Sequence, residues 1–151
     1  MATAADYTLA RLADQAGVDI LLVEDSLGQF SLGYESPLSV TLADILYHTR
    51  PVARGGHRAL VMADLPYAAY HIMPEQALGN ALRLIQEGGA GAVLLEGGRD
   101  LTPVIQQLRQ SRIPAFAHIG LQAKTAALWD GYRTQGLDED SAWALVATAQ
   151  N

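Results

Sequence analysis

Short apolar runs alternate with helical patterns along this chain, and the alternation limits the possible folds more than any other feature of the sequence. The runs are 18–23, 59–62, 92–95 and 113–117. Each is apolar on both alternating faces, as expected for strands that are covered on two sides in a parallel sheet. Pro114 would lie at the start of its strand, where a missing N–H is tolerated. The runs therefore predict four parallel strands.

Helical periodicity fills the segments between these runs. Thr41 and Asp44 form a capping-box pattern that begins a helix ending near His48, and Pro74 suits a first helical position. Further apolar stripes lie within 9–16, 78–85 and 101–108. The alternation of strands and helices predicts an α/β fold built from βα units. A last helix should follow Asp138 and bury an inner face that holds Ala142, Leu145, Val146 and Ala149.

The composition excludes several classes of protein. Half of the 151 residues are apolar and 17% are charged, which is typical of a single globular domain. The net charge of −6 argues against partners such as nucleic acid or anionic membrane lipid. No apolar run approaches the ~18 residues of a membrane-spanning helix. The absence of cysteine excludes disulfides and thiolate chemistry. Because no signal-peptide pattern opens the chain, we expect a cytoplasmic protein.

Polar residues follow each of the four predicted strands. Asp25, Asp64 and Glu96 come after the first three, and the fourth run ends at His118. Ligands of βα folds bind at the carboxyl ends of the strands, so these side chains could converge on one site. Carboxylate oxygens suit a hard cation such as Mg²⁺. The alternative is that each acid caps a helix or lies on the surface, and that His118 is a hydrogen-bonded structural histidine.

A series of short motifs runs in order along the chain. Together they resemble the ketopantoate hydroxymethyltransferase family, in which similar motifs occur in the same order. The motifs are TAADY at 3–7, DSLG at 25–28, YHTR at 47–50, VARG at 52–55, ADLPY at 63–67, LEGG at 95–98, HIGL at 118–121 and GYR at 131–133.

The resemblance implies a fold and a reaction. The fold would be a (β/α)₈ TIM barrel of the phosphoenolpyruvate-mutase type, of which residues 1–151 would form a single incomplete domain with about five of the eight βα units. The reaction would transfer a hydroxymethyl group from 5,10-methylenetetrahydrofolate to 3-methyl-2-oxobutanoate, giving 2-dehydropantoate in pantothenate biosynthesis. Mg²⁺ would be the cofactor, and the chain would form a homo-oligomer or join a complementing subunit.

The resemblance also assigns roles to residues of this chain. Asp25, Asp64 and Glu96 would bind the metal ion, with Glu96 contacting it directly or through water. Asp25, Ser26, Asp64 and His118 would bind the substrate, Ser26 through a hydrogen bond to its carboxylate. A cation beside the keto oxygen would stabilise the enolate that forms when the C3 proton leaves.

The sequence departs from the family pattern at the site. Leu94 stands where the family has a lysine that supplies positive charge to the substrate carboxylate, and Glu24 stands where it has a glycine. Lys124 is the only lysine of the chain, so an arginine would have to replace the lost charge. The family's catalytic base is a glutamate on a later strand, beyond Asn151. We therefore assign no catalytic residue and expect the chain to be impaired alone.

These departures leave two alternatives to the transferase. The chain could be a non-catalytic barrel remnant that binds Mg²⁺ or a 2-oxo acid, or that associates with a complete subunit. It could also be another Mg²⁺-dependent enzyme of the same superfamily that makes or breaks a C–C bond.

Overall fold

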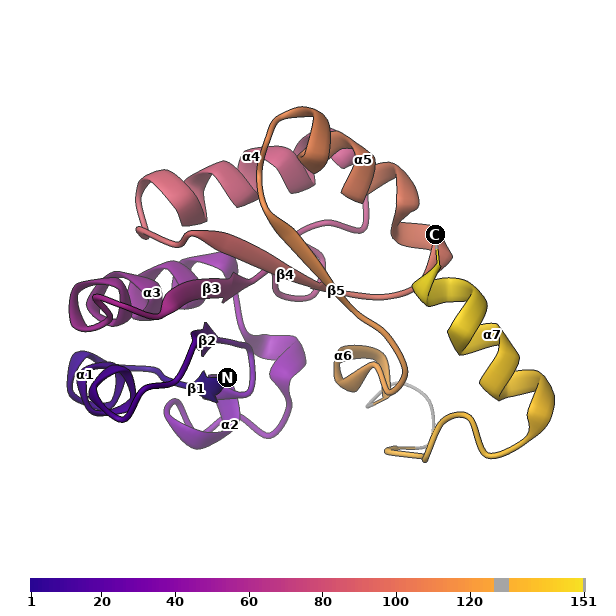
Figure 1. The fold of residues 1–151 in the computed structure, drawn as a ribbon, viewed down its shortest axis with the longest axis horizontal. Coiled ribbons are helices and arrows are strands. Elements are labelled where there is room, and N and C mark those ends of the chain that lie inside the picture. The colour runs from indigo at the N-terminus through magenta and orange to yellow at the C-terminus, as the bar shows by residue number, and fades with distance from the viewer. Residues whose placement is uncertain (127–130, 151) are drawn as a thin grey trace.

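A five-stranded parallel sheet forms the centre of the molecule, with its strands in the order β1-β2-β3-β4-β5 (Figure 1). The computed structural model describes residues 1–126 and 131–150. Four of the strands confirm the four predicted apolar runs. The two-residue β1 adds a further strand, too short for any periodicity to reveal. The strands are β1 (Ala2–Thr3), β2 (Ile20–Val23), β3 (Leu60–Asp64), β4 (Ala92–Glu96) and β5 (Ala115–His118).

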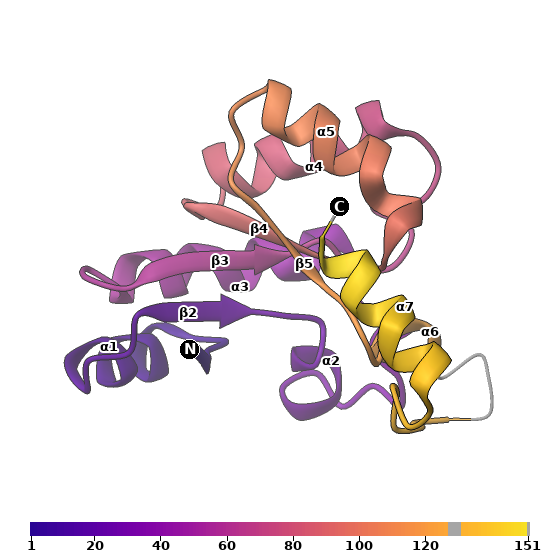
Figure 2. The same cartoon turned by 45° about the vertical axis from the view of Figure 1, so that its right-hand side comes forward.

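Helices cover one face of this sheet (Figure 2). Alternate strand residues such as Leu21, Val61 and Val93 point into the main core, where they meet buried helix residues such as Ile45 and Leu84. This packing explains the apolar stripe of segment 101–108. In segment 9–16, by contrast, Leu9 and Leu12 are 46% and 53% exposed and Ala10 is the buried residue. The covering helices are α1 (Tyr7–Gln15), α3 (Leu42–Gly55), α4 (Pro74–Gln86) and α5 (Thr102–Gln110).

The opposite face of the sheet carries a second, smaller cluster. Leu22, Met62 and Ala92 are buried there, and Ile20 and Leu94 pack against them. The register pairs Leu22 with Met62 and Met62 with Ala92, so the three side chains form a row across the sheet. Because side chains alternate along a strand, the same short runs supply both clusters. This is why the runs are apolar on both faces.

Short helices lie beyond the carboxyl ends of the strands (Figure 2). They are α2 (Leu27–Phe30) and α6 (Ala123–Ala126), together with the 3₁₀ turns η1 (Pro37–Ser39) and η2 (Arg99–Leu101). None of the described helices combines the length and the apolar character that crossing a bilayer requires. The carboxyl end of the sheet is thus framed by short segments that can carry functional side chains.

The start of α3 was predicted correctly, but its end was not. Thr41 and Asp44 form the expected capping box, in which the Thr41 side chain accepts from the Asp44 N–H and Asp44 accepts from the Thr41 N–H. The helix then continues past His48 to Gly55, with Pro51 inside it. Val52 is fully buried in the core beyond the proline. Its packing extends the helix through a residue that normally ends one.

The last helix, α7 (Glu139–Ala149), begins after Asp138 as predicted, and Asp138 and Ser141 form a capping box. The prediction that α7 buries an inner face was wrong. None of its residues is buried, and Val146, placed on that face, is 45% exposed. The apolar residues of α7 are spread around the helix, and within the described residues no sheet face packs against one side of it.

Candidate functional site at the carboxyl ends of the strands

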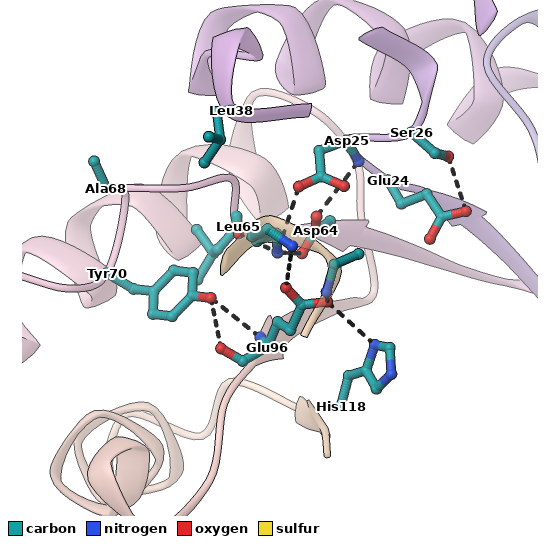
Figure 3. Close-up of polar contacts among 12 residues, drawn as sticks. Glu24, Asp25, Ser26, Leu38, Asp64, Leu65, Ala68, Tyr70, Glu96 and His118 are labelled. Atoms are coloured by element: carbon teal, nitrogen blue, oxygen red, sulfur yellow. Dashed lines mark hydrogen bonds and ion pairs between the residues drawn. The ribbon is translucent and has the colours of Figure 1, made fainter. Parts of the chain in front are cut away.

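The structure brings the side chains that follow the strands into one small pocket (Figure 3). Asp64, Glu96 and His118 are the last residues of β3, β4 and β5, and Asp25 follows β2 by two residues. Because the strands are parallel and in register, their ends lie side by side. The pocket has a volume of about 140 Å³, suited to a small ligand, and is lined by Glu24, Asp25, Ser26, Gln29, Pro37, Asp64, Leu94, Glu96, His118, Ala123, Lys124 and Tyr132.

Asp25 and Asp64 form a buried carboxylate pair at the base of this pocket. They are 7% and 1% exposed, and the Asp25 N–H donates to Asp64 Oδ2 at 3.4 Å. Burial raises the pKa of both carboxyl groups above the usual value of an aspartate, because desolvation disfavours the charged form. The positive charge of Lys124 opposes both shifts. The pair therefore depends on a nearby cation to stay ionised.

Lys124 provides that cation, and the sequence analysis did not place it in the site. Its Nζ donates to Asp64 Oδ1 at 2.6 Å and to the Leu65 carbonyl at 3.0 Å. It also lies 3.9 Å from Asp25 Oδ2 and 5.6 Å from the centre of the Tyr70 ring. Only 3% of the residue is exposed. The one available signal was that a single lysine follows the HIGL motif, at a position in α6 that reaches back over the sheet.

Glu96 holds α6, and with it Lys124, against the strand ends. Its Oε1 accepts from the Ala123 N–H at 2.9 Å, and its Oε2 accepts from the Lys124 N–H at 2.8 Å. His118 Nδ1 lies 3.6 Å from Glu96 Oε1, close enough for an ion pair when the imidazole is protonated. Both carboxylate oxygens of Glu96 therefore already accept hydrogen bonds. Its predicted role as a metal ligand stays a prediction.

Tyr70 positions the end of β4 from the loop before α4. Its hydroxyl donates to the Glu96 carbonyl at 2.7 Å and accepts from the Glu96 N–H at 3.2 Å (Figure 3). The ring is 1% exposed, and burial raises the pKa of the phenol well above its usual value. A tyrosine in a loop gave no sequence signal for this role. The hydroxyl remains a neutral hydrogen-bond partner of the backbone that carries Glu96.

Glu24 is held at the edge of the pocket. Its Oε1 accepts from Thr3 Oγ1 and from Ser26 Oγ, both at 3.0 Å. The carboxylate thus links β1 to the start of α2. The Ser26 hydroxyl donates a hydrogen bond to Glu24. A ligand would therefore meet the backbone N–H of Ser26 or the lone pairs of the Ser26 hydroxyl oxygen.

The donor set of the pocket suits a divalent ion only in part. Asp25 Oδ2 is buried and has no hydrogen-bond partner among the described residues, and it faces the same space as Asp64. Two carboxylates of this kind are suitable ligands for Mg²⁺, which commonly keeps several waters. However, the described part of the chain contains no group of three acidic or histidine side chains arranged around one point. The Lys124 ammonium lies against one of the two carboxylates.

Comparison with known proteins decides the family. The model of the family described as ketopantoate hydroxymethyltransferase matches residues 1–151. The chain belongs to this family. It is 45% identical over 150 residues to the 3-methyl-2-oxobutanoate hydroxymethyltransferase of Syntrophus aciditrophicus (strain SB), covering 99% of this chain and 55% of that protein. The enzyme of the same name from Bacillus licheniformis is 46% identical over 146 residues, 97% of this chain and 53% of its own length. The chain spans about half the length of the curated relatives it matches.

Solved structures show the same fold at low sequence identity. A putative phosphonomutase from Burkholderia cenocepacia J2315 superposes with a TM-score of 0.68 and 18% identity, over 99% of this chain and 62% of that one. A 2,3-dimethylmalate lyase described as a PEP mutase/isocitrate lyase superfamily member superposes with a TM-score of 0.62 and 17% identity. The match covers 99% of this chain and 52% of that one. The predicted fold class is confirmed in its architecture: the chain is an α/β fold with a five-stranded parallel sheet, a partial TIM barrel that shares its fold with these structures.

Proposed function

We propose that this chain carries the metal- and substrate-binding half of a ketopantoate hydroxymethyltransferase active site. The reaction is the transfer of a hydroxymethyl group from 5,10-methylenetetrahydrofolate to 3-methyl-2-oxobutanoate. One observation carries the proposal: Asp25 and Asp64, two buried carboxylates, meet at the carboxyl ends of adjacent strands, and one oxygen of the pair has no hydrogen-bond partner among the described residues. Membership of the family supplies the reaction.

In this proposal Asp25 and Asp64 hold the ion. Glu96 contacts the ion through water, or directly after one of its hydrogen bonds from the backbone N–H groups of α6 is broken. Mg²⁺, when bound, supplies positive charge beside the keto oxygen, where negative charge develops as the C3 proton leaves. The Ser26 backbone donates to the substrate carboxylate. His118, half-exposed at the end of β5, contacts the substrate from the open side of the pocket.

We propose that the general base comes from outside these 151 residues. The family resemblance implies a glutamate on a later strand, and the chain covers 55% of the Syntrophus relative, which supports this proposal. Residues 1–151 would then form one incomplete barrel domain that functions in a homo-oligomer or with a complementing subunit. The exposed Phe116 of β5 and Val146 of α7 are apolar side chains that such a partner could cover.

A second candidate function is a remnant that binds metal or a 2-oxo acid without catalysis. The ion pair between Lys124 and Asp64 favours it, because the position a metal ion would need already holds a positive charge. Leu94 favours it as well, since an apolar side chain lines the pocket where the family has a lysine.

Proton NMR in D₂O distinguishes the two functions. Loss of the C3 proton signal of 3-methyl-2-oxobutanoate is followed with and without Mg²⁺, while calorimetry measures binding of the ion. We expect the wild type to bind Mg²⁺ and to show Mg²⁺-dependent exchange once a complementing subunit supplies the base. In Asp64→Asn we expect at least about tenfold weaker Mg²⁺ binding and loss of that exchange. Asp19→Asn is the matched control, because the Asp19 side chain is 87% exposed.

Each outcome decides between the functions. Binding of both Mg²⁺ and the 2-oxo acid without exchange, even when a complementing subunit supplies the base, would establish the remnant. A folded chain that binds neither would reject the proposed function. Unchanged Mg²⁺ affinity in Asp64→Asn would remove Asp64 from the ligand set.

A further inference from the structure

Lys124 is the only lysine of the chain, and its ammonium group is nearly sealed from solvent within the site. The side chain is 4% exposed. Two of its three N–H donors are used, toward Asp64 Oδ1 and the Leu65 carbonyl. Among the described residues no acceptor lies within hydrogen-bond distance of the third donor, since Asp25 Oδ2 is 3.9 Å away. The ammonium thus makes a short hydrogen-bonded ion pair with Asp64 and only a longer ion pair with Asp25.

The position of this ammonium is also the position that a bridging cation would take. Mg²⁺ binds oxygen ligands at about 2.0–2.1 Å. An ion shared by Asp25 and Asp64 would therefore lie in the space between their facing oxygens, which Lys124 Nζ now occupies. Two positive charges at such a short separation in a buried site repel strongly. The lysine and the metal ion cannot share the pair.

The balance of charge in the pocket shows what a displaced ammonium would do. Four carboxylates line the pocket, those of Glu24, Asp25, Asp64 and Glu96. Among the described lining residues Lys124 is the only permanent cation, since His118 is charged only when protonated. An anionic ligand is therefore repelled unless positive charge is added. Positive charge from a divalent ion held by Asp25 and Asp64 would leave the Lys124 ammonium free to meet the ligand.

Release of the ammonium need not remove it from the pocket. The backbone N–H groups of Ala123 and Lys124 are held by Glu96, so α6 stays at the strand ends while the flexible stem of the lysine changes rotamer. Leu94 lines the same pocket and offers no charge. The freed Nζ would then be the available cation on this side of the bound acid.

We propose that Lys124 is an internal counter-ion that a divalent metal displaces from Asp25 and Asp64, and that its freed ammonium then binds the carboxylate of the 2-oxo acid. Both steps rest on the proposed function, the first on its metal site and the second on its substrate. Lys124 is by this inference a substrate-binding residue that also weakens metal binding. Removal of the Lys124 ammonium should therefore raise the affinity for Mg²⁺ and lower the affinity for the 2-oxo acid.

The single lysine allows a direct test in the unmodified full chain. Protein labelled with [ε-¹³C]lysine, with no lysine in any tag, gives one labelled side-chain signal, that of Lys124. We expect Mg²⁺ to move this signal with the same saturation that calorimetry reports for binding of the ion. Addition of 3-methyl-2-oxobutanoate should then move it again. A signal that stays in place at saturating Mg²⁺ would overturn the inference and leave the proposed function intact.

A variant tests the opposite changes in affinity. In Lys124→Gln we expect Mg²⁺ to bind about tenfold more tightly or better, because a buried competitor is gone. The Mg²⁺-loaded variant should bind 3-methyl-2-oxobutanoate about ten- to a hundredfold more weakly, because a charged hydrogen bond is lost. Arg109→Gln removes an exposed positive charge from α5 and should change neither affinity.

The readouts separate failure of the inference from failure of the proposed function. Equal Mg²⁺ affinity in wild type and folded Lys124→Gln would overturn the inference alone. Absence of Mg²⁺ binding in both proteins would reject the metal site of the proposed function, and the inference with it. If the variant does not fold, the labelled wild-type chain still decides the outcome, since that measurement needs no substitution.

Discussion

The strands β2 to β4 and the segment from β5 to α7 are built from similar residues but are packed very differently. In β2, β3 and β4 most residues are buried, and Leu21, Ala63 and Val93 are at or near zero exposure. No residue of β5 is buried, and Phe116 is 44% exposed. Figure 1 shows helices lying along the first group of strands, whereas α7 lies to one side of the sheet.

The difference shows that an apolar pattern predicts an element without predicting its burial. The pattern of β5 resembles that of β4, whereas the apolar residues of α7 are spread around the helix and do not form a single stripe like that of α4. Burial requires a second surface, and for β5 to α7 the described residues provide little of one. The candidate site lies where the two regions meet: Asp64 ends β3, His118 ends β5, and Lys124 of the second segment is buried against Asp64.

The largest expected effect compares a buried leucine of the packed region with an exposed valine of α7. Leu84→Ala should lower the free energy of unfolding by about 2–5 kcal/mol, because it leaves a cavity in the core. Val146→Ala should change it by less than about 0.5 kcal/mol, since the side chain is 45% exposed. Urea denaturation followed by circular dichroism measures both. Similar losses in the two variants would contradict the division into two regions.

A smaller effect is expected where Tyr70 connects the regions. Tyr70→Phe removes two hydrogen bonds to the backbone of Glu96, which holds α6, so we expect a loss of about 1–3 kcal/mol. Amide hydrogen exchange should rise first at Ala123 and Lys124, because their N–H groups donate hydrogen bonds to the Glu96 carboxylate. Tyr47→Phe is the control, because Tyr47 is 70% exposed. Unchanged protection of both amides would mean that Tyr70 does not position α6.

The smallest effect concerns two helix caps of the same design. Thr41→Ala breaks the capping box of α3 and should cost about 1 kcal/mol, because that helix packs on the core. Asp138→Ala breaks the box of α7 and should leave the urea midpoint unchanged while the helical circular dichroism signal falls. If both variants lower the midpoint equally, α7 unfolds together with the sheet.

Much of the fold could be predicted because it depends on local patterns. The apolar runs predicted β2 to β5, and Thr41, Pro74 and Asp138 marked where helices begin. The structure brings the four side chains chosen from the strand ends into one pocket, since parallel strands end at one edge. Glu96 illustrates the limit of such predictions, because no sequence pattern could show that both of its carboxylate oxygens accept hydrogen bonds from backbone N–H groups of α6.

By itself the sequence determined the order of the main strands and helices, the parallel sheet, the family and the residues at the strand ends. These follow from periodicity, capping residues and short motifs, which are properties of neighbouring residues along the chain. Only the tertiary structure decided that Lys124 lies between Asp25 and Asp64, that Tyr70 holds the end of β4, and that α7 stays exposed. The physical reason is that burial and charge pairing depend on which segments meet in space, and residues 60 positions apart have no local pattern in common.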